Sequence, residues 1–78
     1  MFLKIQVQNT ETIRECSKFD IDWANLMDSG FVTISFNGAP DDYVTVPVGA
    51  SVFVMNDAGR TVDAYHIRAT GRFSDRNA

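Results

Sequence analysis

Residues 31–69 read FVTISFNGAPDDYVTVPVGASVFVMNDAGRTVDAYHIRA, and the prediction of the fold class starts from this segment. It holds four runs rich in Val, Phe, Tyr, Ile and Thr, which are separated by Asn37-Gly38, Gly49-Ala50 and Asp57-Ala58-Gly59. Runs of β-branched and aromatic residues between turn-forming residues are typical of an antiparallel meander. We therefore expect residues 31–69 to form consecutive hairpins of one sheet.

The middle turn defines two faces of the expected sheet. Glycine at the first position of Gly49-Ala50 favours a two-residue type II′ turn, in which residues 43–48 pair with residues 51–55. In that register the core face carries Val44, Val46, Val48, Phe53 and Met55. The opposite face is more apolar than a solvated face should be, so we expect it to bind a partner or a second copy; the residues proposed for this contact are Tyr43, Val52, Val54 and Tyr65.

One strand and two short helices are expected before this stretch. Residues 3–7 alternate between apolar and polar side chains, which indicates a strand with one buried face. Thr12 and Glu15 have the spacing of a capping box, which predicts a helix near residues 11–18. Asp20 can cap a second helix over residues 21–28, which Gly30 would end in the left-handed conformation.

The last strand, residues 61–69, changes the parity of its apolar positions, which predicts a bulge near Ala64 or burial on both faces. The complete pattern predicts an α+β fold in the order β-α-β-β-β-β. Its five-stranded, mostly antiparallel sheet or half-barrel would be strongly twisted, with one or two short helices on one side. We expect a single domain over residues 1–78, with residues 73–78 as a frayed tail.

A single cysteine, Cys16, excludes an intramolecular disulfide and a zinc site built from several thiolates. Residues 1–6 show no apolar segment of a signal peptide, and no run of about 18 apolar residues is present. We therefore expect a cytoplasmic protein that is not associated with a membrane.

Charge is distributed unevenly along the chain. The net charge is −3, yet residues 11–42 hold seven acids against Arg14 and Lys18. These acids, for which we predict a role in partner binding, are Glu11, Glu15, Asp20, Asp22, Asp28, Asp41 and Asp42. An acidic surface attracts basic protein surfaces and repels nucleic acid, although a run of charge can also be only a solvated face.

No group of residues predicts catalysis, a metal site or a cofactor. His66 is the only histidine, and a general base needs a partner that orients it. Cys16 fits a small buried apolar residue better than a reactive thiol. The pairs Asp20 with Asp22 and Asp41 with Asp42 lack the spacing of a calcium loop, and the glycines are isolated turn residues. We expect a protein that is not an enzyme and that binds no cofactor.

The function that these features favour is a small acidic module that binds a partner protein with a basic surface. In size and charge the chain resembles small phage-encoded inhibitors, including anti-CRISPR proteins and DNA mimics. This resemblance implies that carboxylates spaced like phosphates would block a basic, nucleic-acid-binding surface of the partner.

Two alternatives belong to other classes. The C-terminal part contains Arg68, Arg72 and Arg76 beside Tyr65, His66 and Phe73, which is the composition of a small β-barrel that binds single-stranded nucleic acid. A sequence pI near 4.7 argues against direct nucleic-acid binding. A homodimer or another homo-oligomeric assembly would instead use the apolar face and a free edge strand.

Overall fold

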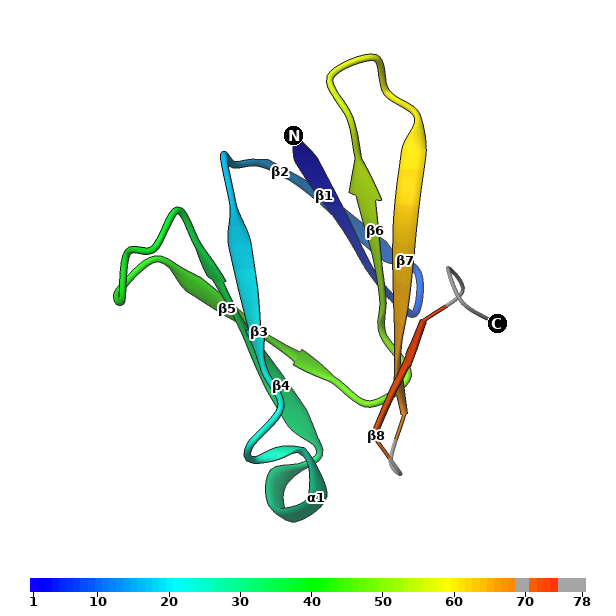
Figure 1. Cartoon of the computed structure of the whole chain (residues 1–78). Helices are drawn as coiled ribbons and strands as arrows, with labels where there is room; N and C mark the ends of the chain where they lie inside the picture. The colour runs from blue at the N-terminus through cyan, green and yellow to red at the C-terminus, as the bar shows by residue number, and fades with distance from the viewer. Residues whose placement is uncertain (69–70, 75–78) are drawn as a thin grey trace.

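The computed structural model describes residues 1–68 and 71–74, and in this part of the chain nearly all regular structure is β (Figure 1). One helical turn, α1, spans Leu26–Ser29. The eight strands are β1 (Phe2–Val7), β2 (Thr10–Glu15), β3 (Phe19–Asp22), β4 (Phe31–Phe36), β5 (Tyr43–Pro47), β6 (Ser51–Met55), β7 (Thr61–Arg68) and β8 (Gly71–Ser74).

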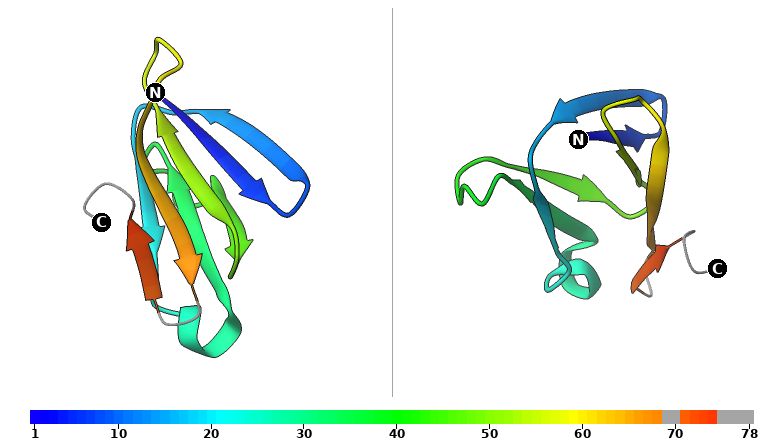
Figure 2. Two further views of the ribbon diagram at one scale, coloured as in Figure 1. Left: turned by 90° about the vertical axis from the view of Figure 1, so that its right-hand side faces the viewer. Right: turned by 45° about the horizontal axis from the view of Figure 1, so that its top comes forward.

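The strands form two antiparallel sheets that face each other across one core (Figures 1 and 2). Sheet A has the strand order β2-β1-β6-β7-β8, and sheet B has the order β3-β4-β5. The chain passes from sheet A to sheet B between β2 and β3, and it returns between β5 and β6. The predicted α+β fold with one five-stranded sheet is therefore wrong.

The predicted hairpin of residues 43–55 accounts for much of this error. Among the residues that the structure describes, β5 pairs only with β4, whereas β6 pairs with β1 and β7, so Gly49 lies in a corner between the two sheets. Its amide donates to the carbonyl of Ile67 at 2.8 Å, and the amide of Ile67 donates to the carbonyl of Ala50 at 2.9 Å. Gly49 has φ 98°, a conformation that both a type II′ turn and this corner require. The local sequence therefore could not distinguish the two.

The two predicted helices are also corrected. Residues 10–15 form β2, which pairs with β1 through a tight turn at Gln8 and Asn9. The capping-box spacing of Thr12 and Glu15 was misleading because the segment has too few apolar side chains to hold a helix against a sheet. Residues 19–22 form β3, and only Leu26–Ser29 is helical. Gly30 ends this turn in the left-handed conformation with φ 75°, as predicted.

Three predicted features of the strands are confirmed. β1 and β4 lie where the alternating patterns placed them, with the even positions of β4 buried. The turn at Asn56–Gly59 connects β6 to β7, and the side chain of Asn56 accepts hydrogen bonds from the amides of Ala58 and Arg60 at 3.0 Å each. The register shifts where Val54 faces Asp63 and Met55 faces Thr61, so a bulge lies at Val62, two residues from the predicted Ala64.

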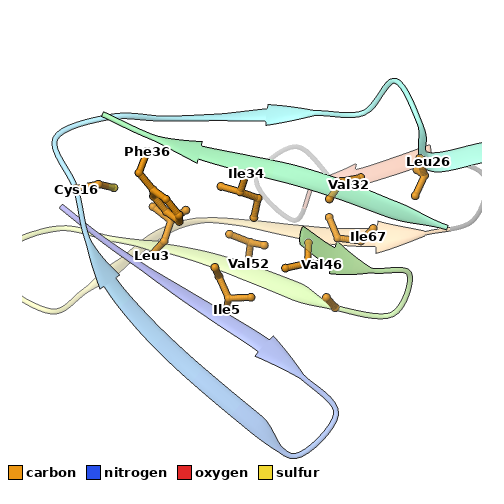
Figure 3. Close-up of a cluster of buried hydrophobic side chains, with 11 residues drawn as sticks. Leu3, Ile5, Cys16, Leu26, Val32, Ile34, Phe36, Val46, Val52 and Ile67 are labelled. Carbon is orange, nitrogen blue, oxygen red and sulfur yellow. The ribbon is translucent and has the colours of Figure 1, made fainter. Parts of the chain in front are cut away.

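The core lies between the inner faces of the two sheets (Figure 3). Sheet A contributes Leu3, Ile5, Val52 and Ile67, and sheet B contributes Val32, Ile34, Phe36 and Val46. The predicted core face of β6 is wrong by one residue, since Val52 and Val54 are buried while Phe53 and Met55 point outward. Val48, predicted to be in the core, is 40% exposed at the corner. Without a β5–β6 pairing, the parity of β6 is set by its neighbours in sheet A.

Candidate protein-binding surface

The seven acids of the predicted binding surface do not form one continuous face. Glu11 and Glu15 on β2 are the partners of Gln6 and Phe2, so they point outward from sheet A. Asp20 and Asp22 alternate with Phe19 and Ile21 on β3, and they point outward from sheet B. The other three acids lie in α1 (Asp28) and in the β4–β5 loop (Asp41 and Asp42). Two separate acidic groups therefore replace the single face.

Asp42 has an intramolecular role. The Arg14 guanidinium donates to both carboxylate oxygens of Asp42, at 2.6 and 2.5 Å, and it lies 4.4 Å from the centroid of the Phe36 ring. This ion pair links edge strand β2 of sheet A to the loop that precedes edge strand β5 of sheet B. Because Asp42 is paired within the molecule, it contributes less than the other acids to an intermolecular contact.

The outer face of sheet B, which we call the sheet B face, is built from three aligned strands. The register places Asp20, Ser35 and Tyr43 in one row, and Asp22, Thr33 and Thr45 in the next. Phe31 and Pro47 form a third row. Each side chain alternates with a core residue of its own strand, so all of them point away from the core. Two carboxylates, four hydroxyl groups and three rings therefore share one surface.

Two aromatic rings on the sheet B face are available for contact. Tyr43 is 54% exposed and Phe31 is 45% exposed, so both rings can supply apolar contact area to a partner. Of these two residues, Tyr43 alone belongs to the contact surface predicted from the sequence. The shared parity of Phe31, Thr33 and Ser35 was visible in the sequence, whereas their alignment with β5 required the correct strand pairing.

Asp20 borders two hollows on the surface. One hollow, of about 360 Å³, lies beside Ser35 and Pro40, with Lys18 at its rim. The other, of about 250 Å³, lies between Asp20, Trp23 and Tyr65. A long basic side chain of a partner can lay its aliphatic stem in either hollow and place its charge on the Asp20 carboxylate.

The predicted apolar contact surface is not formed as expected. Val52 is fully buried and Val54 is 7% exposed, so neither side chain can contact a partner in the folded protein. Tyr65 is half-buried, and its ring packs edge-on against Phe19 with centroids 6.4 Å apart. Of the four residues proposed for this surface, Tyr43 is the one that the structure leaves exposed.

His66 and Cys16, the two residues weighed for a catalytic role in the sequence, have the following neighbours in the structure. Ser51 Oγ and His66 Nδ1 lie 3.1 Å apart on neighbouring strands of sheet A. Cys16 is buried beside Phe36, and burial raises the pKa of its thiol above the ordinary value. A raised pKa keeps the thiol protonated and poorly nucleophilic at neutral pH.

Residues 1–68 and 71–74 contain neither a cluster of metal-ligating side chains nor a membrane-spanning helix. No group of three or more His, Cys, Asp or Glu side chains in this part of the chain could hold a metal ion. No helix within the same residues is long and apolar enough to cross a membrane.

Comparison with protein-family models, with curated proteins and with solved structures finds no match to this chain.

Proposed function

We propose that this protein is a non-enzymatic binding module that docks its sheet B face on a basic surface of a partner protein. The observation that carries this proposal is the alignment of Asp20 and Asp22 on one outward-facing edge strand, beside exposed Tyr43 and Phe31. Carboxylates attract Lys and Arg of the partner, and the rings supply apolar contact area. Both features are typical of protein interfaces.

The composition of the face supports specific recognition beyond charge attraction. Hydroxyl groups of Thr33, Ser35 and Thr45 can donate and accept hydrogen bonds across an interface. A standard interface takes about 800 Å² from each partner. The whole chain exposes 5128 Å², so a stable contact would occupy a large part of one layer of the molecule. We therefore propose that the partner contacts most of one sheet face.

The proposed target is a basic surface that normally binds nucleic acid. Residues two apart on a strand advance by about 6.8 Å and point to the same side of the sheet. β3 therefore presents the Asp20 and Asp22 carboxylates in a row, as a nucleic-acid strand presents successive phosphates along its backbone. A channel that contacts phosphates with Lys and Arg can accept these carboxylates, and the protein would then act as an inhibitor.

The single cysteine supports a reducing compartment, so we place this function in the cytoplasm.

Carboxylates on β3 also have a simpler role, because charged residues on an edge strand prevent strand pairing between molecules. Glu11 and Glu15 on edge strand β2 have the same simple role. They therefore provide a matched control of equal charge.

The test compares affinity capture from a host lysate by three baits: the wild type, Asp20→Asn/Asp22→Asn and Glu11→Gln/Glu15→Gln. Each variant removes two negative charges from one edge strand. We expect a protein that elutes from the wild type with salt, that is retained by the β2 variant and that is lost from the β3 variant. Equal retention by both variants would refute the assignment to the sheet B face. Equal loss of the captured protein from both variants would show that capture depends only on the net charge of the bait.

A further inference from the structure

The outer face of sheet A carries a different chemistry from that of the sheet B face. Its outward positions on β1, β6 and β7 follow from the register, in which they alternate with the core residues Leu3, Ile5 and Val52. The outward side chains are Phe2, Lys4 and Gln6 on β1, Ser51, Phe53 and Met55 on β6, and His66 and Arg68 on β7; Ala64 has the same parity but is buried. None of these residues is an acid.

The centre of this face is the ring of Phe53. The ammonium group of Lys4 lies 5.0 Å from the centroid of the Phe53 ring, and the imidazole of His66 packs against the ring edge-on with centroids 6.4 Å apart. Ser51 lies 3.1 Å from the imidazole of His66. An aromatic ring, a cation and two hydrogen-bonding side chains therefore meet on three adjacent strands.

A hollow of about 390 Å³ adjoins this cluster at the corner between the sheets. Its polar lining residues are Ser51, His66 and Arg68, and the rest of its lining is Val48, Gly49, Ala50 and Ile67. Arg68 lies two residues beyond His66 on β7, so its guanidinium is on the same side of the sheet. The hollow therefore combines a positive charge, an imidazole and a hydroxyl group, which are side chains that bind phosphate oxygens.

We propose that the outer face of sheet A binds single-stranded nucleic acid, with a base on Phe53 and a phosphate in the hollow beside His66 and Arg68. Proteins that bind single strands combine aromatic side chains on a sheet with cations that follow the backbone. A base would replace Lys4 on the ring, because an exposed cation–π contact is weaker than base stacking, and Lys4 would then reach a phosphate.

This proposal explains the layout of charge. Glu11 and Glu15 lie at the β2 margin of the same face, and the other acids of residues 11–42 lie in sheet B, α1 and the β4–β5 loop. Asp57 and Asp63 lie in the β6–β7 loop and near the start of β7, at the end of the sheet away from the hollow. A strand that crosses the middle of β1, β6 and β7 therefore avoids the five acids of sheet B, α1 and the β4–β5 loop. The site is on the opposite layer from the proposed protein contact, so each function can fail without the other.

The test is fluorescence anisotropy of a labelled oligothymidylate titrated with the full chain at low salt. Phe53→Leu removes the ring and keeps an apolar side chain, and we expect binding roughly tenfold weaker. Phe53→Tyr keeps the ring and should bind like the wild type. Arg68→Gln should reduce the slope of log affinity against log salt by about 0.7, the value for one phosphate contact on a single strand, and Arg68→Lys should preserve the slope.

Two further variants separate this site from the sheet B face. Glu11→Gln/Glu15→Gln should bind the oligonucleotide more tightly, because it removes repulsion at the margin of the site. Asp20→Asn/Asp22→Asn should bind within about twofold of the wild type, because these carboxylates lie on the other layer. Loss of binding in the second variant and not in Phe53→Leu would overturn the proposal.

Folding of each variant is checked by circular dichroism. An amide NMR spectrum of the wild type provides a readout that needs no mutation. Amide chemical shifts should change on β1, β6 and β7 when the oligonucleotide is added. The absence of binding by the wild type at low salt overturns the proposal, and so do shift changes confined to sheet B. Light scattering identifies self-association, and a dimer that covers this face would also refute the assignment.

Discussion

The ion pair between Arg14 and Asp42 offers a quantitative test of the two-sheet fold. Removal of the Arg14 side chain by Arg14→Ala breaks a bidentate contact that links an edge strand of sheet A to the β4–β5 loop of sheet B. It also removes a cation that lies 4.4 Å from the centroid of the buried Phe36 ring. If residues 11–18 formed the helix that the sequence pattern predicts, no contact between Arg14 and Asp42 would be expected.

The magnitude follows from exposure. The two side chains are 38% and 36% exposed, so the pair belongs with surface ion pairs, which contribute about 0.2–1 kcal/mol. The contact with Phe36 adds about 0.5–1 kcal/mol. Arg14→Ala should therefore lower the free energy of unfolding by about 1–2 kcal/mol. A chain of this size has a total stability of about 4–12 kcal/mol, so the loss is easily measured.

The assay is urea unfolding followed by the fluorescence of Trp23, for the wild type, Arg14→Ala, Asp42→Asn and the double variant. We expect a coupling energy of about 0.5–1 kcal/mol between the two sites, which decreases at 1 M salt because the Debye length falls to about 3 Å. Arg60→Ala in the β6–β7 loop is the control and should change little. A coupling energy near zero at low salt would refute the proposed link between the sheets.

Three other predictions test the core, the corner and the cysteine. Val52→Thr should destabilise the protein by about 1–3 kcal/mol, because it buries a hydroxyl group in the core. The control is Val62→Thr at the exposed bulge, which should change the urea midpoint of unfolding little. Similar midpoints for the two variants would contradict the register of β6. Gly49→Ala should lower stability by about 1–2 kcal/mol in the same urea assay, since φ 98° strains any residue with a Cβ; no loss would argue against this corner geometry. Cys16 should react with a disulfide reagent at pH 8 more than about tenfold slower in the native than in the unfolded protein. Because burial raises the pKa of the Cys16 thiol, its contribution to the free energy of unfolding is fully present below the ordinary thiol pKa of about 8.5 and is lost as pH rises through the raised pKa. Cys16→Ala should reduce this loss of stability at alkaline pH. A fast reaction of the native protein with the reagent would show that the thiol is accessible.

Part of the binding surface could be predicted from the sequence. The outward parity of Thr33 and Tyr43 relative to their apolar neighbours is a local property of each strand, whereas Asp20 was predicted to cap a helix and not to lie on a strand. Their alignment into one face depends on β4 pairing with both β3 and β5, which involves residues that are distant in the chain. The cluster of Lys4, Phe53 and His66 likewise requires three strands from both ends of the chain.

Features that depend on neighbouring residues follow from the sequence: the buried faces of β1 and β4, the turn at Asn56–Gly59, the left-handed Gly30 and the exclusion of an intramolecular disulfide. The placement of β5 and β6 in different sheets depends on long-range pairing, because a glycine with positive φ is compatible with both a hairpin and a corner. That choice rests on the free energy gained when two apolar layers bury each other. It therefore also decided that Val52 and Val54 lie in the core, and that Phe53 lies on the surface.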